Sequence, residues 1–562
     1  MDRRSGGGAA RTANVSKSAP WAGKARWCCV RKGVSGSVKL ITKEEAAALV
    51  QDGMTVGVGG FGAYGAPESL LQALADRFDA TGHPAGLTVT CTVSPGNNTY
   101  ENEGLNRIAK DGLINTIIAG HLANPPMIAE MVAENRLAAY TLPLGVVVHL
   151  YDAIAGHKPA VLTKVGLGTY ADPRKEGCKA NTKTEAQNRD IVELVHLTEG
   201  DFLLYKTFPI QLCFIRATCA DEKGNVSMEE EAVGDFSLNM AAAVHNSGGI
   251  VVVEAGKIVK TGTIPPKKVR VHASIVDYAV IADGSKYRQG YAAANRGELS
   301  GSFQIPVAAL EPMKMSNRKI IARRGAMELV PNCLINLGIG MPSGIGSVAN
   351  EEGISATLSL ESGPQGGVPV EGLGFGASVN PEVIYNLSDI FHLYDGGVLS
   401  MTFLGAAEID GHGNVNVSKF GSRCTGPGGF INISQNTPRV HFIGTFTTGG
   451  LRETVENGKL IILQEGQQRK FCKKIQQITF SGDYAASTGQ QVMYITERAV
   501  FRLDGHELLL TEIAPGIDLQ KDILDQMEFR PKIADNLRLM DSRIFLDKKM
   551  NLVLPGEQAQ EE

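Results

Sequence analysis

The chain has 562 residues, of which 43% are hydrophobic and 20% are charged, with a formal net charge of -4 at pH 7. This length exceeds one ordinary core and predicts two domains of roughly 200–280 residues. The charge disfavours a nucleic-acid binder, which would carry a basic domain, and no uncharged apolar run reaches the roughly 20 residues needed to span a bilayer. The nine cysteines form no CxxC pair and have no neighbouring His at zinc-ligand spacing. We therefore expect a soluble globular protein with reduced thiols, no metal site, and neither nucleic acid nor membrane as a partner.

Residues 1–37 differ in composition from the rest of the chain. From Met1 to Thr42 the single acidic residue is Asp2, against nine Lys and Arg, and Gly, Ala and Ser fill the gaps. This composition is typical of an organellar import peptide and predicts a mitochondrial transit peptide and a location in the mitochondrial matrix. The alternatives are a basic tail without an address or a misassigned start codon, with the protein in the cytoplasm.

The first folded elements have the order of an open α/β sheet. Residues 43–50 predict a helix with Thr42 as its N-cap, and residues 55–58 predict a short strand. The glycine-rich run 59–66 follows, and a second helix is expected to start near Pro67, because proline suits the first turn of a helix. Strand, glycine loop and helix form the unit of an α/β fold.

The same unit returns in the second half of the chain. Residues 333–337 predict a strand, 338–342 a glycine loop, and the following segment a helix through Ile345 and Val348. A second repeated segment is found at Asp221–Val226 and again at Asp410–Val415, and each copy is suited to a hairpin turn. The chain therefore predicts two related open α/β halves fused in one polypeptide.

The repeated segments also suggest domain boundaries. We expect an N-terminal domain at 38–316, a C-terminal domain at 317–546 that starts with a helix near 319–330, and a charged, partly ordered tail at 547–562. The spacing of the repeated segments indicates roughly 90 extra residues in the first half, which we expect around 100–200.

One segment combines a strand with an accessible carboxylate. Residues 357–360 predict a strand that runs directly into Glu361, and a glycine- and proline-rich loop follows at 363–369. Ligands of open α/β sheets bind beyond the carboxyl ends of the strands, and flanking glycines let backbone N–H groups approach an oxyanion. Spacing alone is more typical of a surface glutamate at the start of a solvated turn.

Two more glycine loops in the same half could cradle phosphates or form an oxyanion hole. Residues 372–381 are expected to lead into a helix near Glu382, and residues 425–432 into a β segment. Neither is followed by the Lys-Ser/Thr of a phosphate-binding loop. Residues 57–62 fit GxGxxG, but the helix starts too late for a dinucleotide site.

The histidines favour structural roles. His412 lies in a predicted turn and should be exposed, whereas His121 and His149 lie in apolar segments typical of hydrogen-bonded core histidines. No pair has the i, i+4 spacing of a helical metal site. No G-x-S-x-G elbow accompanies a histidine, which disfavours a serine hydrolase.

Taken together, the segments resemble the family I coenzyme A transferases, in the single-chain form of the propionate and acetate CoA-transferases, which is related to succinyl-CoA:3-ketoacid CoA-transferase. The resemblance extends from about Val38 to Leu546. Its segments are Val58–Gly62 with Pro67-Glu68, Glu103–Leu105, Gly120-His121, Leu162–Thr169, Asn336–Pro342, Glu361–Pro364, Phe375–Pro381, Gly426–Asn432 and Gly444–Thr447.

The resemblance implies ping-pong transfer of CoA from an acyl-CoA to a short carboxylic acid. Glu361 would be the nucleophile and would carry CoA as a glutamyl-CoA thioester. No metal, and no cofactor other than CoA itself, is implied. The acid could be acetate, propionate, acetoacetate or another 3-oxo acid. We expect weakly polar acids, because no Arg or Lys follows Glu361 to clamp a second carboxylate.

The resemblance also suggests the remaining site residues. Backbone N–H groups of Gly428 or Gly429 would form part of the oxyanion hole, and the second donor of the family, a glutamine amide, aligns with Asn97 or, failing that, Asn98. The expected CoA-binding positions are Gly338, Gly340, Gly363, Gly376 and Asn380.

Two other functions stay open at this point. An acyl-CoA thioesterase could use the same glutamate with water as acceptor, and a CoA-binding scaffold could have lost activity through the change at Asn97. By analogy of fold, we expect a homodimer or homotetramer.

Overall fold

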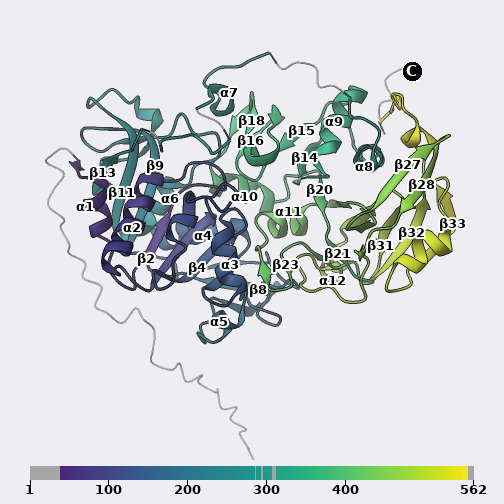
Figure 1. Ribbon diagram of the computed structural model, residues 1–562, viewed down its shortest axis with the longest axis horizontal. Helices are drawn as coiled ribbons and strands as arrows, with labels where there is room; N and C mark the ends of the chain where they lie inside the picture. The colour runs from purple at the N-terminus through teal and green to yellow at the C-terminus, as the bar shows by residue number, and fades with distance from the viewer. Residues whose placement is uncertain (1–37, 285, 293–294, 307–311, 339, 555–562) are drawn as a thin grey trace, which may run out of the picture. The chain divides into compact units, whose positions relative to one another are not determined.

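The computed structural model describes residues 38–554, apart from 285, 293–294, 307–311 and 339 (Figure 1). The predicted transit peptide and the last eight residues of the predicted tail lie outside the described residues.

The first half is built on a ten-stranded sheet, drawn in purple to teal in Figure 1. Its main path has the order β1-β13-β11-β9-β2-β3-β4-β5, and all neighbouring strands on that path are parallel. The strands are β1 (Lys39–Leu40), β2 (Thr55–Val58), β3 (Leu87–Val93), β4 (Ile114–His121), β5 (Ala138–Thr141), β9 (Leu212–Asp221), β10 (Val226–Ser227), β11 (Ile250–Val259), β12 (Val269–Val271) and β13 (Tyr278–Ile281).

Helices cover both faces of this sheet, because its central strands are apolar on both sides. Along β9, Leu212 and Phe214 belong to one hydrophobic cluster and Cys213 and Ile215 to another, which is the alternation of a strand. Residues of α2 and α3 join the first cluster, and residues of α4 and α6 join the second. The helices of this half are α1 (Lys43–Ala48), α2 (Glu68–Thr81), α3 (Pro126–Ala133), α4 (Leu144–Ala155), α5 (Thr182–Glu185), α6 (Ser237–Asn246) and α7 (Gly297–Ser300), with the 3-10 helices η1 (Gly104–Ile108), η2 (Pro266–Lys268) and η3 (Ala273–Ile275).

The second half contains another ten-stranded sheet, in green to yellow, with the order β19-β16-β15-β14-β20-β25-β30-β31-β32-β33. Its centre, from β15 to β30, is parallel. The strands are β14 (Leu334–Leu337), β15 (Thr357–Ser359), β16 (Pro364–Gln365), β19 (Val383–Ile384), β20 (Met401–Gly405), β25 (Arg439–Ile443), β30 (Gln491–Ile495), β31 (Ala499–Asp504), β32 (Glu507–Ile513) and β33 (Lys532–Leu539).

Smaller elements surround this sheet. The α-helices are α8 (Asn317–Ala326), α9 (Ser343–Glu352), α10 (Leu387–Asp395), α11 (Phe430–Asn436) and α12 (Gly482–Thr488); the π-helix is η5 (Leu519–Ile523); and the 3-10 helices are η4 (Gly372–Gly374), η6 (Leu524–Gln526) and η7 (Ser542–Phe545). The short strand pairs are β17 (Val368–Pro369) with β18 (Ser378–Val379), β21 (Glu408–Ile409) with β22 (Val415–Asn416), β23 (Lys419–Phe420) with β24 (Arg423–Cys424), β26 (Thr447–Thr448) with β29 (Gln468–Arg469), and β27 (Arg452–Glu456) with β28 (Lys459–Gln464).

The repeated turn has the same geometry in both halves. The Asp221 carboxylate accepts the backbone N–H of Asn225 at 2.9 Å, and the Asp410 carboxylate accepts that of Asn414 at 3.0 Å. In each turn the asparagine side chain also donates to the aspartate at 2.9 Å. The equivalence of these turns confirms the expectation of two related α/β halves.

Most predicted elements form, with small shifts at their ends. Thr42 caps α1, and its reciprocal hydrogen bonds with Glu45 complete a capping box. Helix α2 begins at Glu68, one residue later than expected, with Pro67 at the N-cap.

Two predictions about the segments after glycine loops are wrong. No helix starts near Glu382, because Val383 and Ile384 pair with β16 and extend the sheet, so that α10 begins only at Leu387. Residues 430–436 form helix α11 in place of the expected β segment, with the Ile433 N–H bonded to the Gly429 carbonyl at 3.0 Å. Its apolar and polar residues are both buried, so the helix lacks the single apolar face by which a surface helix is recognised in a sequence.

The expected insert is only partly separate from the main sheet. Strands β6 (Ala160–Thr163), β7 (Val192–Leu197) and β8 (Gly200–Lys206) form an antiparallel sheet of their own, whereas β4 and β5 belong to the first large sheet. At the C-terminus, Met550 and Leu552 donate backbone N–H groups to Glu352, so the first part of the expected tail is docked on α9.

Candidate active site

Glu361 lies where β15 ends and the chain turns back on itself. The Gly363 N–H donates to the Leu360 carbonyl at 3.0 Å, and the Leu360 N–H donates to the Pro364 carbonyl at 2.9 Å. Gly363 has a φ of +113° and lies against Tyr385, whose carbonyl oxygen would be 2.3 Å from a Cβ at position 363. This turn requires glycine, and it holds Glu361 at the carboxyl edge of the second sheet.

The Glu361 side chain lies against the start of helix α11. A Cβ at Gly429 would lie 3.2 Å from Glu361 Cβ and 3.0 Å from Glu361 Cγ. Glycine at position 429 therefore makes room for the glutamate. The expected proximity of Glu361 to the 425–432 loop is present in the structure.

Burial shapes the charge of this glutamate. It raises the pKa of the Glu361 carboxyl above its ordinary value, and the Asn336 amide acts in the opposite direction as a hydrogen-bond partner. Asn336 also donates to the Ser359 carbonyl at 3.0 Å, and the Ser359 hydroxyl lies 2.7 Å from that of Tyr394. These three residues are almost fully buried, so they form a fixed polar layer beneath Glu361.

The two glycines proposed for the oxyanion hole differ in availability. The Gly428 N–H donates to the Gly120 carbonyl at 2.9 Å, at the end of β4. Among residues 38–554 as described, the Gly429 N–H donates no hydrogen bond. The backbone next to Glu361 thus offers an unused donor at Gly429.

His121, from the first half, lies beside the loop that contacts Glu361. Its Cδ2 lies 3.9 Å from the position of a Cβ on Gly428. Burial lowers the pKa of His121 to about 4, and Nδ1 lies 3.4 Å from the Ala123 N–H, which it can accept in the neutral form. This neutral, partly buried state fits the sequence interpretation of His121 as a hydrogen-bonded structural histidine.

Asn124, the third residue after β4, was missed by the sequence analysis. Its amide nitrogen lies 3.5 Å from the position of a Cβ on Gly62, and its side chain is a hydrogen-bond partner of His121. Its carbonyl accepts the Asn98 N–H at 2.9 Å. Only folding brings the 121–126 turn against the 94–98 loop.

The Asn97 amide is occupied within its own loop. Its Nδ2 donates to Glu101 at 3.1 Å and to Glu103 at 2.8 Å, and its Oδ1 accepts the Thr99 N–H at 3.0 Å. Asn98 is exposed and has a φ of +62°. Neither residue presents a free, buried amide in this conformation, and the oxyanion role of either stays a prediction.

Two expected CoA-binding glycines lie next to Glu361. The Ser362 hydroxyl donates to the Gly376 carbonyl, so the loop carrying Gly376 covers the residue after Glu361, and Gly363 forms the turn described above. A Cβ at Gly376 would meet Phe61 Cε1 at 3.8 Å. The glycine loop of the first half therefore contacts the glutamate loop of the second.

The other expected CoA-binding positions have structural partners. The Gly338 N–H donates to the Phe403 carbonyl at 2.9 Å, which continues the sheet, and the Gly340 carbonyl accepts the Ser343 hydroxyl at 2.9 Å. The Asn380 amide bonds both backbone groups of Ile305, at 3.0 and 2.7 Å. A CoA-binding role of these three residues stays a prediction.

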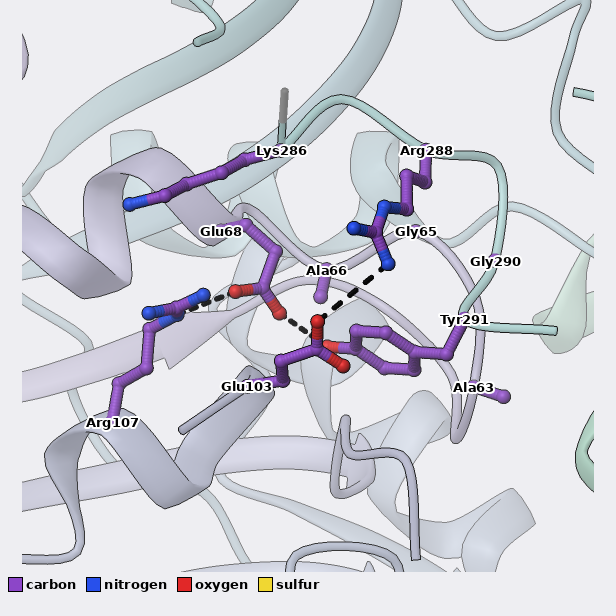
Figure 2. A pocket seen from close by; sticks show the side chains of 10 residues that line it. All are labelled: Ala63, Gly65, Ala66, Glu68, Glu103, Arg107, Lys286, Arg288, Gly290 and Tyr291. Atoms are coloured by element: carbon purple, nitrogen blue, oxygen red, sulfur yellow. Dashed lines mark hydrogen bonds and ion pairs between the residues drawn. The ribbon is translucent and has the colours of Figure 1, made fainter. Parts of the chain in front are cut away.

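A polar cavity lies beside the first glycine loop (Figure 2). Glu68 and Arg107 point toward each other with 2.5 Å between Oε2 and Nε, both nearly buried, and the Tyr291 hydroxyl donates to Glu68. Arg288 lies 3.6 Å from Glu103, the carboxylate that also holds Asn97. This network fixes the loop on which Asn97 lies.

Two searches of the structure bear on other classes of function. Over the described residues, no group of three or more His, Cys, Asp and Glu is placed to hold a metal ion. None of the helices in that part of the chain is long and apolar enough to cross a membrane.

Known proteins with similar sequences point to one family. The sequence model described as Coenzyme A transferase matches residues 40–282. Caffeate CoA-transferase from Acetobacterium woodii is 42% identical over 91% of this chain and 98% of its own length. This chain belongs to the coenzyme A transferase family. Acetate CoA-transferase YdiF from Escherichia coli K12 is 39% identical over 93% of this chain and 98% of its own.

The fold agrees with that of a solved family member. A crystal structure of the acyl-CoA transferase YdiF from E. coli O157:H7, as a thioester complex with CoA, has a TM-score of 0.86 and 38% identity, covering 93% of this chain and 99% of that one. The predicted single-chain CoA-transferase fold is thus confirmed. The protein is an enzyme of the CoA-transferase type that acts on acyl-CoA and carboxylates. The two relatives compared here are bacterial, so they give the predicted mitochondrial location no support.

Proposed function

We propose that the enzyme transfers CoA by a ping-pong mechanism in which Glu361 carries CoA as a glutamyl thioester. The observation that supports this most strongly is the half-buried carboxylate at a strand end, packed against Gly429 with its unused N–H. The solved relative whose structure is a thioester complex with CoA supports the same chemistry.

In the proposed steps, the Glu361 carboxylate first forms a mixed anhydride with the acyl group and then a thioester with CoA. A Glu361 oxygen attacks the acyl-CoA carbonyl, and the C–S bond breaks, releasing CoA thiolate and leaving a mixed anhydride. The thiolate then attacks the Glu361 carbonyl, and the acyl group leaves as a free carboxylate. The acceptor acid reverses these steps, so no net proton, electron or water is consumed.

The surrounding residues would stabilise the two tetrahedral intermediates. The Gly429 N–H is a backbone donor beside the reacting carboxyl, and a side-chain amide from the first half would be the second donor. Asn124 is the stronger candidate for that amide, since the Asn97 N–H groups already bind Glu101 and Glu103. Asn336 would hold the glutamate in its ionised form.

CoA itself would be bound along the glycine loops, with Gly363 and Gly376 next to the reacting centre and Gly338, Gly340 and Asn380 farther along the second half. The proposed reaction requires no metal and no cofactor other than CoA. Acetate and related short acids such as propionate or a 3-oxo acid are the proposed acceptors, in keeping with the relative named an acetate CoA-transferase. A homodimer or homotetramer and mitochondrial import directed by residues 1–37 remain parts of the proposal.

Mass spectrometry of the intact enzyme tests the mechanism. Incubation with acetyl-CoA alone should add the mass of CoA to a peptide containing Glu361, and Glu361→Gln should abolish the adduct. An adduct on a cysteine or serine would contradict the mechanism. Assays with and without acceptor acid distinguish the alternatives. A transferase forms a new acyl-CoA only with an acceptor acid, a thioesterase releases CoA without one, and a scaffold catalyses neither transfer nor hydrolysis.

A further inference from the structure

A small cavity lies behind the segment that carries Glu361. It encloses about 350 Å³, including its open mouth, and its lining residues include Gly60, Phe61, Tyr64, Arg216, Glu231 and Gly234. These residues come from the first glycine loop, from β9 and from the segment before α6. None of them belongs to the set proposed above for catalysis or CoA binding.

The cavity borders the residues next to Glu361. The Gly234 N–H donates to the Ser362 carbonyl at 2.6 Å, and a Cβ on Gly363 would lie 2.9 Å from Gly234 Cα. On the other side, Phe61 contacts the loop of Gly376, which covers Ser362. A short acid bound at Glu361 therefore has this cavity as its neighbour in the first half.

Arg216 is the unusual residue of the lining. Its side chain is only 2% exposed, and its guanidinium lies 4.2 Å from the ring centre of Tyr287. Nη1 alone donates to the two oxygens of Glu231, at 2.7 and 2.6 Å. Nε and Nη2 are buried without a hydrogen-bond partner among the described residues. Leaving such donors unmet is costly, so a ligand that accepts from them gains affinity.

The charges around Arg216 limit the kind of acceptor. Glu231 already neutralises the guanidinium, and Asp235 also lines the cavity, with Arg270 as its partner at 3.3 Å. A second carboxylate placed here would face Glu231 and Asp235 as like charges. A neutral oxygen can accept from Nε and Nη2 without that repulsion.

We propose that this cavity receives the chain of the transferred acid and that Arg216 donates hydrogen bonds from Nε and Nη2 to a hydroxyl or carbonyl oxygen on that chain. Arg216 is then a determinant of specificity, favouring oxygenated short acids over their plain alkyl counterparts. The proposal rests on the proposed role of Glu361, since it assigns the acyl subsite of that reaction.

Competing acceptors test the subsite. For the full-length enzyme with acetyl-CoA as donor, kcat/KM is measured for butyrate, 3-hydroxybutyrate and 3-oxobutyrate. The wild type should prefer at least one oxygenated acid over butyrate by about 10-fold or more, and Arg216→Met should reduce that ratio by at least about 10-fold. A wild-type ratio near one, or an equal loss for all acids in the variant, overturns the proposal.

Two further variants keep the outcome clear. Arg216→Met combined with Glu231→Gln removes both charges, so that it avoids an unpaired buried carboxylate if the single variant does not fold. Arg270→Met is the matched control, because Arg270 also pairs with an acid of the cavity but does not line it, and the ratio should not change. The CoA adduct on Glu361 is measured in parallel: its absence in the wild type contradicts the proposed function, whereas its presence with no selectivity contradicts only the subsite.

Discussion

Glu361 and Gly429, which both belong to the second half of the chain, are in contact. Glu361 Cγ lies 3.0 Å from the position that a Cβ on residue 429 would occupy. The contact joins the end of β15 to the start of α11. It places the carboxylate beside an N–H that has no acceptor among the described residues. The first two predictions follow from this relationship and from the polar layer beneath it.

Gly429→Ala should reduce activity far more than stability. Gly429 has a φ of -79°, which alanine adopts without strain, so the cost arises from the contact with Glu361. The added methyl group should displace the Glu361 carboxylate by up to about 1 Å, and this should reduce kcat by about 100-fold. The free energy of unfolding should fall by only about 1–3 kcal/mol.

Gly156→Ala is the matched control for this variant. Gly156 has a φ of -86°, and its nearest neighbour, the Asp152 carbonyl oxygen, lies at an ordinary 3.4 Å from an added Cβ. Steady-state kinetics and chemical denaturation of both variants make the comparison. Wild-type kcat in Gly429→Ala would show that the glutamate does not need its present position.

Asn336 should set the acid limb of the pH profile. Burial raises the pKa of Glu361, so kcat/KM should decline, as the pH falls, at a higher pH than an ordinary glutamate would give. The Asn336 amide lowers that pKa, and Asn336→Ala should therefore move the limb to still higher pH. The ratio of kcat/KM at pH 8 to that at pH 5 should rise in the variant.

The exposed Asn350 provides the control for this profile. Asn350→Ala should leave the acid limb where the wild type has it. Asn336→Ala also loses the bond to the Ser359 carbonyl, which should cost about 1–3 kcal/mol of stability. A uniform loss of activity at every pH would mean that Asn336 acts only through the fold.

The sequence was sufficient to predict the two halves and the position of Glu361, because both depend on local order. Strand, glycine turn and helix are encoded within short segments, and the repeated aspartate turn has the same hydrogen bonds at Asp221 and Asp410. The family resemblance then suggested the role proposed for Glu361. Neither step requires knowledge of which distant segments meet.

The rest of the site depends on contacts between distant segments. The partners of Asn97 are carboxylates a few residues away, and no sequence pattern favours them over a substrate as its partners. Arg216 lies within a fully buried strand, where only the fold shows that two of its N–H groups face no acceptor. Helix α11 was expected as a β segment. Both its apolar and its polar residues are buried by packing, so its sequence does not show the apolar periodicity of a surface helix.

The identity of the amide donor can be decided by comparing two asparagines. If Asn124 supplies the second oxyanion hydrogen bond, Asn124→Ala should reduce kcat by about 100-fold or more, as expected for the loss of one such donor. Asn97→Ala should act mainly on stability, because it frees Thr99, Glu101 and Glu103 from their shared partner. Asn124→Gln keeps the amide and should retain more activity than Asn124→Ala.

Single-turnover formation of the Glu361 adduct, measured beside thermal unfolding, separates the effect on catalysis from the effect on stability. The opposite pattern, with catalysis lost in Asn97→Ala and a wild-type rate in Asn124→Ala, would return the oxyanion role to Asn97 and require its loop to release that amide when acyl-CoA binds.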